Sequence, residues 1–82
     1  MKDSANSREM QVRFGEAVRA RRIALGLSQE TLATRCGLHR TYISEIERGT
    51  KSPSLKTISS LSVELGVRPS ELVAQAEGDA GA

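Results

Sequence analysis

The chain has 82 residues, which is enough for one domain with a small hydrophobic core. Its only aromatic side chains are Phe14 and Tyr42, so aliphatic residues must supply that core. No apolar run approaches the length of a transmembrane helix, and the N-terminus lacks the features of a secretory signal. The single cysteine, Cys36, cannot form an internal disulfide, which agrees with a reducing compartment. We therefore expect a cytoplasmic protein.

The net charge of +2 conceals an asymmetry along the chain. Residues 1–56 contain eleven Lys and Arg against six Asp and Glu, a balance of +5. Residues 57–82 contain one Arg against four acidic residues, a balance of −3, and the two balances sum to +2. The basic part would attract a polyanion, although an ordinary solvated surface explains the charges equally well.

Apolar spacing predicts an all-α fold of five short helices. Residues 1–9 are polar and are expected to form a flexible leader. The first helix should run from about Glu9 to Leu25, with Phe14, Val18 and Leu25 on its apolar stripe, and end at Gly26. Later helices are expected over about residues 29–35, 40–48, 55–65 and 69–76, with Ser28 and Ser54 as N-caps and Gly37, Gly49 and Gly66 at helix ends. Residues 77–82 are expected to be a disordered tail.

The second and third predicted helices are separated by residues 36–39 only. A connection this short makes two helices cross steeply, which is the geometry of a helix-turn-helix. Steep crossing requires a small residue at Ala33 and a left-handed turn at Gly37. It also requires five side chains to face inward, and all five are suitable: Leu32, Cys36, Leu38, Ile43 and Ile46. A plain helical hairpin with no nucleic-acid role is the alternative.

Three stretches resemble the Cro/repressor-type (Xre) helix-turn-helix family: LSQETLA at residues 27–33, HRTYISEIERG at 39–49 and PSL at 53–55. The resemblance extends over about residues 14–75. It implies a compact five-helix, repressor-like DNA-binding domain, here residues 10–76, that acts as a homodimer on a pseudo-palindromic operator. The HRTYIS run followed by IERG is similar to the controller proteins of restriction–modification systems, and other small regulators share it.

The outer face of residues 40–48 is expected to read DNA bases. Because Ile43 and Ile46 face the core, the opposite face consists of Arg40, Thr41, Ser44 and Glu45. The guanidinium of an arginine can pair with guanine O6 and N7, and a threonine can contact a thymine methyl group or a phosphate. A solvated polar helix face is the alternative interpretation of the same residues.

Contacts to the DNA backbone are expected from helix N-termini and from flanking polar side chains. Gln29, at the start of the second helix, is the strongest candidate, and the family resemblance implies this use of the matching glutamine. The other candidates are Tyr42, Arg48, Lys51 and Ser52.

Arg22 occupies the apolar stripe of the first helix, where an unpaired charge would be costly to bury. Glu47 follows the inward-facing Ile46 and is the expected partner. The resemblance implies the same pairing, so we expect a structural ion pair. Family analogy also places a dimer interface at the end of the fourth helix and on the fifth, around Val67, Arg68, Leu72 and Val73.

The sequence offers no pattern typical of an enzyme. Cys36 and His39 are too few ligands for a zinc site, and the chain has no other Cys or His. It also lacks a nucleophile placed beside a base and a glycine-rich phosphate loop. We therefore expect neither a metal nor a cofactor.

The expected partners are double-stranded DNA and a second copy of the chain, with RNA polymerase as a further candidate and no membrane. An antitoxin-type interaction module that also binds DNA is the alternative function. Such antitoxins usually carry an extra segment that covers the toxin, and only the leader and the tail are spare here.

Overall fold

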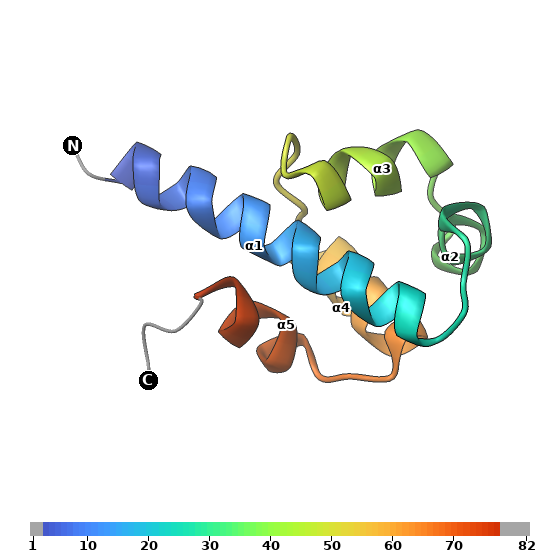
Figure 1. Ribbon diagram of the computed structural model, residues 1–82. Coiled ribbons are helices and arrows are strands. Elements are labelled where there is room, and N and C mark those ends of the chain that lie inside the picture. Colours follow the sequence, from blue (N-terminus) through green and yellow to red (C-terminus); the bar gives the residue numbers. More distant parts are fainter. Residues whose placement is uncertain (1–2, 78–82) are drawn as a thin grey trace.

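A computed structural model describes residues 3–77 and shows five α-helices in that range (Figure 1). They are α1 (Asp3–Ala24), α2 (Gln29–Cys36), α3 (Arg40–Arg48), α4 (Leu55–Leu65) and α5 (Pro69–Ala76). The longest helix, α1, crosses the molecule, and in the view of Figure 1 α3 and α5 lie on opposite sides of it. The five-helix, all-α fold expected from the sequence is confirmed.

The first helix begins earlier than its sequence pattern indicated. It starts at Asp3 instead of about Glu9, so the part of the expected leader that the structure describes is helical. The side chains of residues 7–10 are exposed, and a turn without buried positions carries no apolar period that could reveal it. The helix ends at Ala24, and Leu25 is 43% exposed, so Leu25 does not belong to the apolar stripe. Residues 1–2 and the tail residues 78–82 lie outside the described range.

All five helices contribute to one aliphatic core with a single aromatic ring, Phe14. The largest side chains that are less than 2% exposed form its centre: Val18, Leu32, Ile43, Ile46, Leu61, Ser62, Leu65 and Leu72. The hydroxyl of Ser62 donates a hydrogen bond of 2.8 Å to the carbonyl of Ser59, which compensates its burial. Behind the helix-turn-helix, α1 packs against α3 and α4 packs against α2, while α5 packs against α1 and α4.

The ends of α2 and α4 are formed as their sequences predict. The Ser28 hydroxyl accepts a hydrogen bond of 2.9 Å from the backbone N–H of Thr31, and Ser54 does the same for Thr57 at 3.1 Å. Gly37 has a φ of 69°, so the chain turns sharply after α2 and leads directly into α3.

Gly15 marks the closest approach between α1 and α3. A Cβ atom at this position would overlap the carbonyl oxygen of Ile46 and lie 2.7 Å from that of Glu47. Both obstacles are backbone atoms that cannot rotate away. The crossing of these two helices therefore requires a glycine, a constraint that sequence reasoning missed because a glycine inside a helix has no distinctive spacing.

We expect Gly15→Ala to lower the free energy of unfolding by about 1–3 kcal/mol or more, because the added methyl group must push two packed helices apart. Glu16→Ala, an exposed change on the same helix, should shift it by no more than about 0.5 kcal/mol. Urea denaturation of both variants measures the difference. Equal urea midpoints for the two variants would show that the helices do not touch at Gly15.

Candidate nucleic-acid interface

Helices α2 and α3 pack together with their apolar faces turned to the core. Ile43 and Ile46 of α3 are completely buried, as is Leu32 of α2, and Ala33 is 2% exposed. Cys36 and Leu38 are half-buried and pack against the same cluster. The inner half of the pair thus has the packing that a helix-turn-helix requires.

The opposite face of α3 is polar and accessible along the edge of the molecule (Figure 1). Arg40 and Thr41 are exposed, while Ser44 and Glu45 are half-buried. Arg48 is exposed and donates a hydrogen bond from Nη1 to the Ser44 hydroxyl one turn earlier. The four expected base-reading side chains therefore lie on one helix with a buried apolar side, which leaves their own side available to a ligand.

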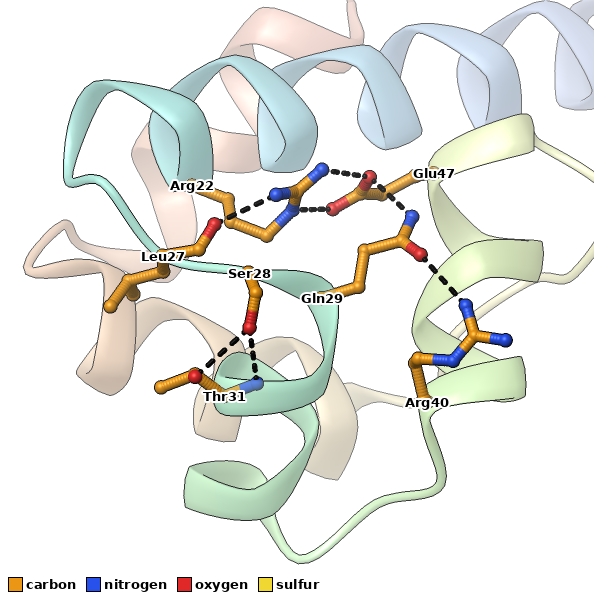
Figure 2. Close-up of polar contacts among 7 residues, drawn as sticks. All are labelled: Arg22, Leu27, Ser28, Gln29, Thr31, Arg40 and Glu47. Atoms are coloured by element: carbon orange, nitrogen blue, oxygen red, sulfur yellow. Dashed lines mark hydrogen bonds and ion pairs between the residues drawn. The ribbon is translucent and has the colours of Figure 1, made fainter.

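Arg22 of α1 and Glu47 of α3 form a buried, two-pronged ion pair (Figure 2). Arg22 Nε donates to Glu47 Oε2 at 2.6 Å, and Nη2 donates to Oε1 at 3.0 Å. The remaining terminal nitrogen, Nη1, donates to the carbonyl oxygen of Leu27 at 2.8 Å. The hydrogen bond with Glu47 raises the pKa of Arg22 above its ordinary value, so the guanidinium remains charged. The pair joins α1, α3 and the segment before α2.

Gln29 extends this network from the buried pair to the exposed start of α3 (Figure 2). Its Nε2 donates to Glu47 Oε1 at 3.0 Å. The amide oxygen is thereby turned outward, where it accepts from Arg40 Nη1 at 3.4 Å. One N–H of the amide is still available for a backbone phosphate, because an amide nitrogen carries two hydrogens. Sequence reasoning missed the link from Gln29 to Glu47, which lies 18 residues away.

Three of the other expected backbone contacts lie at the far end of α3. Arg48, Lys51 and Ser52 are exposed, and the last two belong to the loop between α3 and α4. Tyr42 is half-buried and packs against the core. Cationic or hydrogen-bonding groups therefore flank both ends of the polar face of α3, the arrangement that positions a helix between two DNA backbones.

This arrangement has counterparts among known proteins. A helix-turn-helix family model, HTH_3, matches residues 18–72. The chain belongs to this helix-turn-helix family. It is 52% identical over 61 residues to the control protein C.BamHI of Bacillus amyloliquefaciens, an alignment that covers 73% of this chain and 75% of the relative. It is 37% identical over 70 residues to the control protein C.MunI of Mycoplasma sp., covering 84% and 95% of the two chains.

Solved structures of the family agree with the fold. The restriction–modification controller protein C.AhdI from Aeromonas hydrophila superposes with a TM-score of 0.74 at 47% identity, covering 76% of this chain and 94% of that one. The Xre-type resemblance and the similarity to restriction–modification controllers are thus confirmed. The protein is a DNA-binding transcriptional regulator of the helix-turn-helix family, which is not a class of enzymes.

One member of the dimer surface expected from the sequence lies in the core. Leu72 is only 1% exposed, because α5 turns this side chain toward the other helices, so it cannot contact a second copy. Val67 and Val73 are half-buried, and Arg68 is exposed. Within residues 7–77 the most exposed large apolar side chains are instead on α4, where Leu55 is 84% and Val63 is 71% exposed. Both lie off the buried stripe of α4.

Cys36 has the environment of a core thiol. Burial raises its pKa, and the negative charge of Glu64 raises it further, so the thiol stays protonated and unreactive near neutral pH. Within residues 3–77 no group of three or more His, Cys, Asp and Glu side chains is arranged to hold a metal ion. In the same range no helix is both long and apolar enough to span a bilayer.

We expect Glu47→Ala to lower the free energy of unfolding by about 3–5 kcal/mol, because it leaves the Arg22 guanidinium buried without a counter-charge. Glu45→Ala on the same helix removes a half-buried carboxylate that takes part in no ion pair of the described residues, and should cost at most about 1 kcal/mol. Urea denaturation of the two variants compares them directly. Small and equal shifts would mean that the pair does not stabilise the fold.

Proposed function

We propose that the protein binds a pseudo-palindromic operator as a homodimer and controls transcription from it, as a restriction–modification controller. The observation that supports this most strongly is the exposed polar face of α3, with Arg40 at its start and a fully buried apolar face behind it. The relatives support the controller assignment, since C.BamHI and C.MunI are named control proteins and C.AhdI a restriction–modification controller protein. Such a protein acts in the cytoplasm, where bacterial DNA is found.

In this proposal α3 lies in the major groove and Arg40 reads a guanine. The guanidinium has five N–H donors, and among the described residues only one long hydrogen bond, to Gln29, holds it. It can therefore turn to the O6 and N7 acceptors of guanine at little cost. Thr41, Ser44 and Glu45 complete the base-facing surface, and Ser44 is small enough to let the helix approach closely.

Backbone contacts come from both ends of the motif. Gln29 and the N-terminus of α2 serve one strand, and Arg48, Lys51 and Ser52 serve the other. Tyr42 supplies a hydroxyl beside the base-reading face. These groups set the position of α3 and supply the salt-dependent part of the affinity.

The homodimer places one α3 on each half-site. Its interface is proposed around Val67, Arg68 and Val73, extended by the exposed side chains Leu55 and Val63. Burying two large apolar side chains of each copy contributes favourably to association. RNA polymerase is the further partner proposed for an operator that lies beside a promoter.

Arg40→Ala should relax discrimination at one position of each half-site, at a cost of about 1–3 kcal/mol for a lost bidentate contact. Lys51→Ala should instead weaken binding to all sequences alike and flatten the dependence of log K on log salt by about one unit. Selected-site binding assays of wild type and both variants at two salt concentrations measure these effects. If Arg40→Ala keeps the wild-type consensus with undiminished discrimination, α3 does not read bases through Arg40.

The dimer should bind half-sites about 10–11 base pairs apart, because both copies of α3 must enter the same side of the duplex. Sedimentation at micromolar concentration should give a dimer for the wild type and for Ile23→Glu, a control at another exposed aliphatic residue. Val63→Glu should shift the protein to monomers, because it places a charge on the proposed interface. Monomeric wild type, with one copy bound to each operator, would rule out the assembly.

A further inference from the structure

The early start of α1 brings a part of the chain expected to be a leader into contact with the end of α3. Side chains and backbone from the two helices line one open hollow, which we call the basic hollow. In the view of Figure 1 the N-terminal turns of α1 extend past the loop that follows α3. The residues that line the hollow are Ser7, Arg8, Gln11 and Val12 from α1, and Arg48, Gly49 and Thr50 from the end of α3.

The basic hollow combines two positive charges with no acidic side chain among the described residues that line it. Both guanidinium groups, of Arg8 and Arg48, belong to exposed residues. The acidic residue next along α1, Glu9, does not line the hollow and lies 3.9 Å from Arg13. Each guanidinium group can donate two parallel N–H groups to the oxygens of an anion. Two such groups on one concave surface therefore favour an anion that accepts hydrogen bonds from both of them.

The carbonyl groups at the end of α3 would repel an anion, but local donors occupy them. Gln11 Nε2 donates to the carbonyl oxygen of Gly49 at 3.1 Å. The backbone N–H and the hydroxyl of Thr50 both donate to the carbonyl oxygen of Glu45, at 2.9 and 3.1 Å. These hydrogen bonds weaken the negative end of the helix dipole at the hollow, so the two arginines dominate its charge.

The position of the hollow relates it to the DNA-binding surface. Arg48 is one of its cations and also donates to Ser44 on the base-facing side of α3. Lys51 and Ser52, which follow Thr50 in the chain, are proposed backbone contacts. A helix in the major groove has phosphates along both sides, so a basic surface at the end of α3 faces one of the two strands.

We propose that the basic hollow binds a phosphate of the DNA backbone beside the bases that α3 faces, with Arg8 and Arg48 as its cationic ligands. This inference rests on the proposed function and adds a contact from α1 to it. The contact carries no base specificity, because a phosphate is the same in every sequence. Arg8 would therefore raise the affinity for all DNA sequences and steepen the dependence on salt.

The first test compares Arg8→Ala with Arg13→Ala. Both variants remove one arginine from α1 and change the net charge equally, but Arg13 does not line the hollow. Arg8→Ala should weaken operator binding about three- to tenfold and lower the slope of log K against log salt by about 0.9 for each bound copy. Arg13→Ala should change neither by a comparable amount. Alanine favours helix, so both variants should fold, which circular dichroism verifies.

The second test locates the phosphate. Operator duplexes with one neutral methylphosphonate at each backbone position in turn are bound to wild type and to Arg8→Ala. At one backbone position the methylphosphonate should weaken binding by wild type but cause little further loss of affinity in Arg8→Ala. The reason is that the arginine and the charge of this phosphate act through the same contact. The inference is overturned if the methylphosphonates weaken binding by wild type and by Arg8→Ala equally at every position. It is also overturned if the Arg8 and Arg13 variants have identical affinities and identical salt slopes. Wild type without specific DNA binding would instead overturn the proposed function.

Discussion

The arrangement of the helix-turn-helix depends on the buried ion pair between Arg22 and Glu47. One guanidinium connects α1 to α3 through Glu47 and to the start of α2 through the Leu27 carbonyl. A buried charge is tolerated only if its partner and its remaining hydrogen bonds are all present. Within residues 3–77 every deeply buried polar side-chain atom has a hydrogen-bond partner. The network therefore favours one mutual orientation of the three helices, since another orientation would leave part of it unpaired.

The same network leads outward to the exposed start of α3. Glu47 holds the nitrogen of the Gln29 amide, so the amide oxygen is presented to Arg40. A chain of four side chains thus connects the interior of the protein to the proposed base-reading group (Figure 2). Its inner members, Arg22 and Glu47, are buried and hydrogen-bonded to each other, whereas Arg40 at its outer end is exposed and weakly held. The buried part of the network therefore favours one orientation of the helices, and the exposed Arg40 side chain can still adjust to a ligand.

The length and closeness of α1 complete this arrangement. Gly15 allows α1 to approach the backbone of α3 at Ile46 and Glu47, immediately beside the ion pair. The part of α1 before this crossing extends to the end of α3, where Arg8 and Arg48 line the same hollow. One helix therefore supplies the buried cation that stabilises the motif and an exposed cation beside its binding face.

The sequence by itself determined the five helices, four of them nearly to the residue, because serine caps and terminal glycines act locally. It also indicated that α2 and α3 form a helix-turn-helix and that Arg22 needs Glu47, since a short turn and a charge on an apolar stripe allow few solutions. Only the tertiary structure decided the start of α1, whose first turns have no apolar period, and the burial of Leu72, which depends on how α5 packs. It alone placed Gln29 against Glu47 and brought Arg8 and Arg48 to one hollow. These two arrangements join residues far apart in the chain through packing, and no local sequence pattern encodes them.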